Sequence, residues 1–126
     1  MSLKELHDDL LSYVKKGEFA QGIEKFYADD VTQQANADAV QSGMQNLAKA
    51  EYEYQGKVTS LDKVDVLARA IDDQGNDSGV VIYEVHMVWQ HSEGGNVNVE
   101  QTVVERWENG KIKHIRFYGI FDSENA

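Results

Sequence analysis

The first part of the chain carries apolar residues at the spacing of helices. Between residues 3 and 16 they recur every three or four positions, and Gly17 follows as a typical C-terminal stop. A second helical pattern spans residues 18–28, so the two helices should form a hairpin almost without a loop. The apolar positions are Leu3, Leu6, Leu10, Leu11 and Val14 in the first pattern, and Phe19, Ile23, Phe26 and Tyr27 in the second.

A short extended segment and a third helix come next. Residues 31–35 favour an extended form, "ANADAVQSG" is typical of a loop, and Ser42 is the expected cap of a helix that runs to about Tyr54. Its buried side would carry Met44, Leu47, Ala48 and Tyr52. The acids Asp29 and Asp30 in "EKFYADDV" are expected to end the second helix and accept backbone hydrogen bonds in a turn.

Four strand-like runs follow Gly56, at about 57–71, 79–91, 96–108 and 111–121. Their separators, "DDQGNDSG", "SEGGN" and "ENG", contain Gly and Asn residues that tolerate positive backbone dihedrals, which predicts antiparallel hairpins. Helices followed by a meander of strands predict an α+β fold. With 126 residues, we expect a single domain over residues 1–126.

The period-two alternation of the strands predicts which side chains face the helices. Val81, Tyr83, Val85, Met87 and Trp89 share one face of the second run, and Ile115, Phe117, Gly119 and Phe121 share one face of the last.

In the third run, an inward Val103 and Trp107 would bring Gln101 and Glu105 inward with them. Buried polar groups cost free energy unless they are paired. The two polar residues could therefore line a ligand pocket, or Glu105 could sit near the open edge or bond a helix or a tyrosine hydroxyl.

The opposite face mixes apolar, aromatic and charged residues. Such a composition suits a protein interface, and we expect a homodimer through this outer face of the sheet. The apolar members are Ile82, Val88, Val104, Tyr118 and Ile120, interleaved with Glu84, His86, Glu100, Arg106, His114 and Arg116.

Charge and composition narrow the function classes. Twelve basic against twenty-two acidic residues give a net charge of -10, which argues against nucleic acid and membrane partners. The absence of cysteine and of a signal-peptide pattern makes a cytoplasmic location the expectation. The spacing of His7, His86, His91 and His114 predicts no metal site, and we expect no cofactor.

The order of elements and several short stretches resemble the nuclear transport factor 2-like superfamily, also called cystatin-like, and within it the SnoaL-like and ketosteroid isomerase-like proteins. The stretches are "KKGEFAQGIEKFYADDV", "SGMQNL", "VHMVW" and "ERWENGKIKHIRFYG". The resemblance covers nearly the whole chain, but the superfamily hosts many functions.

The resemblance implies a cone in which a strongly bent, mostly antiparallel sheet wraps round the first helix and leaves an apolar pocket at its open end. A small apolar or aromatic molecule would be the expected ligand. The implied wall residues are Tyr13, Val14, Phe26, Gln33, Ala35, Met44, Leu47, Tyr83, Val85, Met87, Gln101, Val103 and Phe117.

This chain lacks the catalytic residues that the isomerase mechanism requires. On the family pattern the carboxylate base falls at Ala35, the acid of the oxyanion hole at Val103, and the tyrosine near Leu10. SnoaL-type cyclases resemble this arrangement and again place their acid near Val103, whereas Glu105 lies two residues along on the same face.

Three interpretations of the pocket therefore stay open. The first is a binding protein. The second is a cyclase-like or isomerase-like enzyme with Glu105 as acid or base, in which Tyr83, Gln101 and Tyr13 position the substrate and Gln33, Gln34 and Gln101 orient the acid. The third is an accessory dimer with a filled cone.

Overall fold

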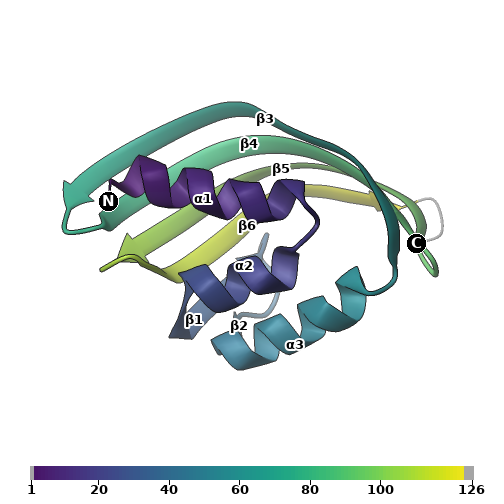
Figure 1. The fold of residues 1–126 in the computed structure, drawn as a ribbon, viewed down its shortest axis with the longest axis horizontal. Helices are drawn as coiled ribbons and strands as arrows, with labels where there is room; N and C mark the ends of the chain where they lie inside the picture. The colour runs from purple at the N-terminus through teal and green to yellow at the C-terminus, as the bar shows by residue number, and fades with distance from the viewer. Residues whose placement is uncertain (1, 124–126) are drawn as a thin grey trace.

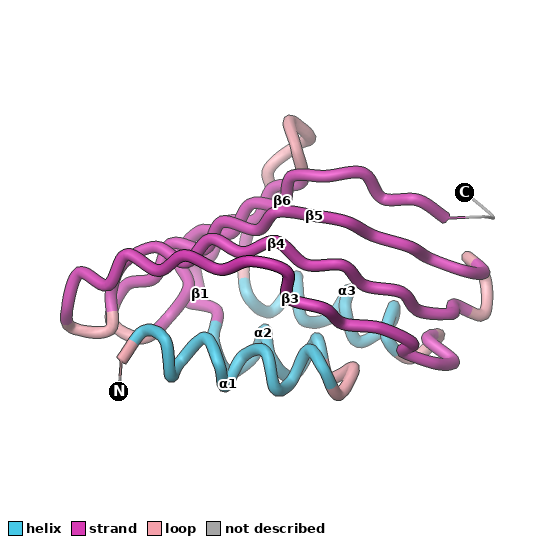
Figure 2. Tube along the Cα trace, turned by 90° about the horizontal axis from the view of Figure 1, so that it is seen from above, coloured by secondary structure: helices cyan, strands magenta, loops and turns pink. Residues whose placement is uncertain are grey.

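The computed structural model describes residues 2–123, of which residues 120–123 are described by their backbone alone. Within this part of the chain, three helices lie under one curved sheet of six strands, as Figures 1 and 2 show. The helices are α1 (Leu3–Lys15), α2 (Phe19–Phe26) and α3 (Met44–Gln55). The strands are β1 (Tyr27–Ala35), β2 (Gln41–Ser42), β3 (Val58–Gly75), β4 (Ser78–His91), β5 (Gly95–Glu108) and β6 (Lys111–Ser123), arranged in the order β2-β1-β6-β5-β4-β3. The α+β class and the mostly antiparallel, open sheet are confirmed.

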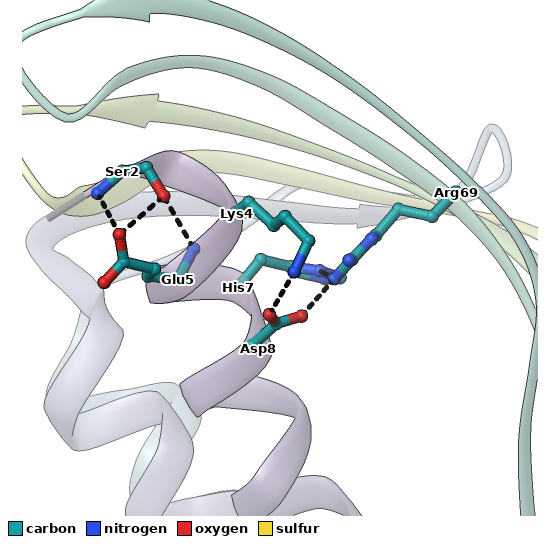
Figure 3. Close-up of polar contacts among 6 residues, drawn as sticks. All are labelled: Ser2, Lys4, Glu5, His7, Asp8 and Arg69. Atoms are coloured by element: carbon teal, nitrogen blue, oxygen red, sulfur yellow. Dashed lines mark hydrogen bonds and ion pairs between the residues drawn. The ribbon is translucent and has the colours of Figure 1, made fainter.

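Helix α1 has a defined start and end. The Ser2 side chain accepts a hydrogen bond from the backbone of Glu5, and the Glu5 carboxylate accepts one from the backbone of Ser2, which makes a reciprocal capping box (Figure 3). At the other end Gly17 takes a φ of 75°, a conformation in which glycine has no side-chain penalty. The helix therefore begins and ends where the sequence predicts.

Helix α2 is shorter than its pattern predicts, and this changes the role of the two acids. The chain turns extended at Tyr27, which pairs with Ile112 of β6, so Asp29 and Asp30 lie within strand β1 and do not end a helix. The Asp30 carboxylate forms an ion pair of 2.7 Å with Lys113 on the neighbouring strand. Strand pairing has overridden the helical period here, and the predicted turn is wrong.

Helix α3 also differs from its prediction. Gly43, with a φ of 91°, occupies the cap position, whereas Ser42 belongs to the short strand β2, where it pairs with Thr32. Leu47 and Ala48 are buried as expected, but Tyr52 is 40% exposed. The helix is rotated so that Glu51 and Tyr54 face the sheet side instead.

The pairing of the strands fixes the concave face. Strands β3 to β6 form the three predicted antiparallel hairpins, and β6 pairs in parallel with β1, a contact between early and late segments that the sequence did not predict. The inward face of β4 is confirmed by the burial of Val81, Tyr83, Val85 and Met87. Val103, Glu105 and Trp107 are buried together on β5, and the predicted orientation of Phe121 lies outside the described side chains.

The convex face carries the apolar residues expected of it. Ile82 and Tyr118 are each 42% exposed, and Ile82 lies directly opposite Val104 on the neighbouring strand. The Arg116 guanidinium lies 4.7 Å from the centre of the Tyr118 ring. The homodimer stays a prediction, which the mass of the particle in solution would test; the side chain of Ile120 lies outside the described ones. Among the described helices, none is long and apolar enough to cross a membrane.

The β3–β4 hairpin generates a prediction about stability. A Cβ atom on Gly79, whose φ is 143°, would collide with the carbonyl oxygen of Asp72 across the hairpin, whereas one on Gly75, whose φ is 86°, would meet no atom within 4 Å. We expect Gly79→Ala to lower the free energy of unfolding by about 2 kcal/mol or more, and Gly75→Ala by about 1 kcal/mol, because only the first adds a backbone collision to the strain. Urea denaturation of both variants measures this, and equal losses would contradict the collision.

Candidate functional site

A cavity of about 340 Å³ lies between the three helices and the concave face of the sheet. Every strand except β2 and β3 contributes to its wall. Most of the lining side chains are aliphatic or aromatic, and the polar ones are few. The lining residues are Leu10, Leu11, Val14, Phe19, Ile23, Tyr27, Gln33, Ala35, Glu51, Tyr54, Tyr83, Val85, Met87, Trp89, Val99, Gln101, Glu105, Ile115 and Phe117.

The cavity brings together nine of the residues that the sequence analysis assigns to the pocket. They are Val14, Gln33, Ala35, Tyr83, Val85, Met87, Gln101, Glu105 and Phe117. Five other expected wall residues do not line it. These are Tyr13, Phe26, Met44, Leu47 and Val103.

Packing explains why those five lie outside the wall. The Phe26 ring packs edge-on against both Tyr13 and Trp107, each at a centroid distance of 6.0 Å, so Phe26 and the half-buried Tyr13 contact other rings instead of bordering the cavity. Val103 is fully buried in the same core, and Leu47 and Met44 pack against it from α3. Gln34, expected as an orienting partner, instead donates to the carbonyl of Asp38.

Glu105 is the central polar group of the site. Its side chain is 0% exposed, and its Oε1 accepts a hydrogen bond of 3.0 Å from the indole Nε1 of Trp107. Its Oε2 is buried and makes no hydrogen bond of ordinary geometry. Burial raises the pKa of Glu105 from 4.5 to about 8, and the nearby Trp107 and Tyr83 donors oppose part of that rise. Glu105 is therefore a neutral carboxylic acid at neutral pH.

His7 of α1 stands beside this acid. Its side chain is 0% exposed, its Nε2 lies 3.6 Å from Oε1 of Glu105, and its Nδ1 lies 3.2 Å from the guanidinium of Arg69 on β3. Burial, helped by the positive charge of Arg69, lowers the pKa of His7 from 6.5 to about 4. Because Glu105 and His7 are both neutral at pH 7, their contact is not an ion pair.

Two tyrosines complete the polar floor. The Tyr83 ring lies 4.7 Å from the His7 ring, and both Tyr83 and Tyr27 line the cavity. Burial and the proximity of Glu105 raise the pKa of both phenols above the ordinary value, so the two hydroxyls stay protonated. The floor of the cavity thus holds an acid and two phenols, and the His7 imidazole lies beside them outside the lining; all four groups are uncharged.

A second polar region comes from α3 and the middle of the sheet. Glu51 lines the cavity, and burial raises the pKa of its carboxyl above the usual value. The indole of Trp89 donates a hydrogen bond of 2.9 Å to the Tyr54 hydroxyl, which fixes both rings at the wall. The Oε1 atom of Gln101 is buried and has no hydrogen-bond partner in the part of the chain that the structure describes. A ligand could satisfy this oxygen and the free oxygen of Glu105.

Sequence reasoning missed His7 and Glu51. His7 continues the apolar stripe of α1, since positions 3, 7, 10 and 14 share one helix face, and that spacing would have placed it inward. Glu51 follows Leu47 and Ala48 by one helical turn, which puts it on the buried side of α3. In both cases the polar character of the residue obscured a helical period that was present.

The catalytic residues of the isomerase are absent from the positions where the family pattern places them. Ala35 lines the cavity where the base would stand, and Val103 is packed in the core where the second acid would stand. Neither side chain moves a proton or donates a hydrogen bond. The acid that the cavity does hold, Glu105, approaches from a position two residues along β5.

Comparison with known proteins identifies the fold. No protein-family model and no curated protein sequence matches the chain. Among solved structures, a protein from Mesorhizobium loti described as a SnoaL-like polyketide cyclase matches with a TM-score of 0.66 at 21% identity, over 94% of this chain and 99% of that one.

Two further structures give the same result. A nuclear transport factor 2-like protein of unknown function from Cytophaga hutchinsonii matches with a TM-score of 0.64 at 16% identity, over 94% and 99% of the two chains. An epoxide hydrolase from M. tuberculosis matches with a TM-score of 0.72 at 18% identity, over 94% and 80%. The chain has the nuclear transport factor 2-like fold that SnoaL-like proteins share, as the sequence resemblance implies.

The opposite pKa shifts of Glu105 and His7 predict a pH dependence of stability. The folded-state pKa of Glu105 is raised to about 8. Its contribution to the free energy of unfolding is therefore complete below pH 4.5 and is lost as the pH rises through 8. The pKa of His7 is lowered to about 4, so its contribution is complete above pH 6.5 and is lost as the pH falls through 4. Between pH 6.5 and 8, Glu105 changes the stability of the protein and His7 does not.

We therefore expect the free energy of unfolding to fall by up to about 2 kcal/mol between pH 6.5 and 8.5, because the unfolded chain gives up this proton more readily. Urea denaturation across this range measures the fall, which should be absent in Glu105→Gln. The matched control is Glu100→Gln, at an exposed position on the same strand, which should keep the slope of the unaltered protein. An unchanged slope in Glu105→Gln would contradict the assignment.

Proposed function

We propose that the protein binds a small, uncharged, largely apolar molecule that carries a polar group, and that Glu105 makes a hydrogen bond to that group. The observation that supports this most is the Oε2 atom of Glu105, which is buried beside the cavity and has no hydrogen-bond partner of ordinary geometry among the described residues. A buried polar atom without a partner costs about 1–3 kcal/mol. A bound ligand that reaches this atom would recover that cost.

The cavity supports a small organic ligand by its size and lining. Its volume of about 340 Å³ falls in the range of small-molecule sites, and its wall is aliphatic and aromatic with a few polar groups. An accessory protein with a filled cone would have no reason to keep such a space, since unfilled volume in an apolar core is destabilising. The cavity thus favours binding over the accessory interpretation.

The electrostatics of the site support an uncharged ligand. The chain has a net charge of -10, which disfavours an anion. The raised pKa values of Glu105 and Glu51 both reflect burial, so a charged group placed beside them would meet the same desolvation cost. The names of two structural neighbours, polyketide cyclase and epoxide hydrolase, denote enzymes acting on small organic molecules, in agreement with such a ligand.

Binding of matched two-ring probes tests the proposal. We expect naphthalene and 1-tetralone, which differ in one ketone oxygen and ring saturation, to bind the protein in calorimetric titrations at pH 6.5. Ala35→Trp should abolish binding of both, because the indole would occupy the cavity. Glu105→Leu should weaken 1-tetralone about tenfold and leave naphthalene unchanged, since one hydrogen bond to a buried group is worth about 1.5 kcal/mol.

The control for an added tryptophan is Val40→Trp, because Val40 is 56% exposed and lies outside the lining. This variant should bind both probes as the unaltered protein does. Circular dichroism would establish that Ala35→Trp is folded before its binding is interpreted. The proposal fails if neither probe binds, or if folded Ala35→Trp binds them as well as Val40→Trp does.

A catalytic role for the same acid is the second candidate. Its support is the pKa of Glu105 at about 8, because a group whose pKa lies near neutrality can both give and take a proton in one reaction cycle. Tyr83 and Gln101 line the same cavity and would orient a substrate. Tyr13, expected in this role from the sequence, packs against Phe26 instead.

A single variant distinguishes a binding role of Glu105 from a catalytic one. If Glu105 is an acid or base, Glu105→Gln should keep the affinity for a substrate within about threefold and lower its turnover at least about a hundredfold, because the amide cannot exchange a proton. The measurement is a single-turnover assay with a ligand found by the probe experiment. If Glu105→Gln keeps its turnover, Glu105 has no catalytic role, and only the binding role remains.

A further inference from the structure

A chain of polar contacts runs from the surface to the acid in the cavity. The Arg69 guanidinium donates a 2.6 Å hydrogen bond to Oδ1 of Asp8 and also contacts Nδ1 of His7 at 3.2 Å (Figure 3). Lys4 donates to the other oxygen of Asp8 at 2.9 Å. Arg69 is positioned for this by its strand, because it lies directly opposite Tyr83, whose ring contacts His7. The proposed binding site does not by itself explain this arrangement.

The contact with Arg69 decides where the hydrogen of His7 resides. A guanidinium only donates hydrogen bonds, so Nδ1 of His7 must be the acceptor. A neutral imidazole has one acceptor and one donor nitrogen, and the hydrogen therefore resides on Nε2. That nitrogen lies 3.6 Å from Oε1 of Glu105. The N–H of His7 thus lies beside the acid, at a distance longer than an ordinary hydrogen bond, and Nε2 has no hydrogen-bond partner among the described residues.

The N–H of Trp107 and this tautomer of His7 together favour one oxygen of Glu105 as the site of its proton. Oε1 accepts the N–H of Trp107 at 3.0 Å and faces the N–H of His7 at 3.6 Å. A hydroxyl hydrogen on Oε1 would compete with the N–H of Trp107 and would point toward the nearby N–H of His7, whereas Oε2 makes no hydrogen bond of ordinary geometry among the described residues, with the Tyr83 hydroxyl the other donor near the carboxyl. A neutral Glu105 consequently keeps its hydrogen on Oε2. The oxygen left for a ligand is a hydrogen-bond donor.

We propose that Arg69 is a positioning residue that sets the polarity of the site: by fixing His7 with its hydrogen on Nε2, it makes Glu105 offer a donor, so the site selects ligands with an acceptor such as a ketone or ether oxygen. The inference rests on the proposed function, which requires only some polar group on the ligand. The inference adds that the polar group of the ligand accepts a hydrogen bond. It also assigns this preference to Arg69, which lies outside the cavity wall.

Loss of Arg69 should reverse the polarity. Without the guanidinium, His7 can carry its hydrogen on Nδ1 and present the lone pair of Nε2 to Oε1. Glu105 then gains by placing its own hydrogen on Oε1, where it can donate to His7. Its Oε2 becomes an acceptor, and ligands that donate a hydrogen bond are favoured over those that accept one.

The test compares 1-tetralone, which only accepts, with indole, whose N–H only donates. Calorimetric titration at pH 6.5 gives the ratio of the two dissociation constants for each variant. We expect Arg69→Met to shift that ratio toward indole by about tenfold, corresponding to one hydrogen bond gained or lost. Arg69→Lys should keep the ratio of the unaltered protein, because an ammonium also donates to Nδ1. Lys4→Met, which changes only the outer partner of Asp8, should keep it as well.

Nitrogen NMR of the His7 ring supplies a readout that a purely structural role would not move. The unaltered protein and Arg69→Lys should show the hydrogen on Nε2, and Arg69→Met should show a population with the hydrogen on Nδ1. The hydrogen on Nδ1 in the unaltered protein would overturn the inference without any ligand, so a poorly folded Arg69→Met does not prevent a decision.

The outcomes separate the inference from the proposed function. If no probe binds the unaltered protein, the proposed function fails, and the polarity of the site fails with it. If the probes bind but the ratio is the same in Arg69→Met and in the unaltered protein, the binding function stands and the role of Arg69 is overturned. A shifted ratio in Arg69→Met together with unshifted ratios in Arg69→Lys and Lys4→Met supports the inference.

Discussion

A strongly curved sheet buries whatever its concave face carries, and this constraint governs the rest of the molecule. Strands β4, β5 and β6 turn one face toward the helices (Figure 2). Most side chains on that face are therefore removed from water, whether they are apolar or not. For Val81 or Val103 this is favourable. For Glu105 the same geometry removes water from a carboxyl, which responds by keeping its proton. The neutral acid is thus a product of the fold's curvature and of strand parity.

Strand parity is also the part of the site that the sequence could supply. Alternation along β4 and β5 placed Tyr83, Gln101 and Glu105 on one face, and the glycine-rich and asparagine-rich turns predicted the hairpins that align them. What the sequence could not supply was the contact between elements far apart in the chain. The parallel pairing of β1 with β6 converts the expected helix end at Asp29 and Asp30 into a strand, and nothing local signals that partner.

The helices show a different limit of prediction. Their periods were readable, but polar residues on the buried side were not recognised as buried, because a polar side chain is usually evidence of exposure. His7 and Glu51 each follow the helical spacing of apolar neighbours. Similarly, Phe26 and Tyr13 are expected at the cavity, yet Phe26 packs edge-on against Trp107 in the core and the half-buried Tyr13 packs against Phe26. Which large side chain fills space and which borders it depends on packing in three dimensions.

The pairing of β1 with β6 has a consequence for how the cavity comes into existence. Residues Gln33 and Ala35 of its wall belong to β1, whose neighbours in the sheet are the two-residue strand β2 and the last strand, β6. During synthesis, β1 emerges about eighty residues before β6, as the register of Gln33 with Ile115 shows (115 − 33 = 82). This wall has no full sheet partner until the ribosome has made the residues of β6. The enclosed space is therefore a late product of translation, and an incomplete nascent chain has no finished site to occupy.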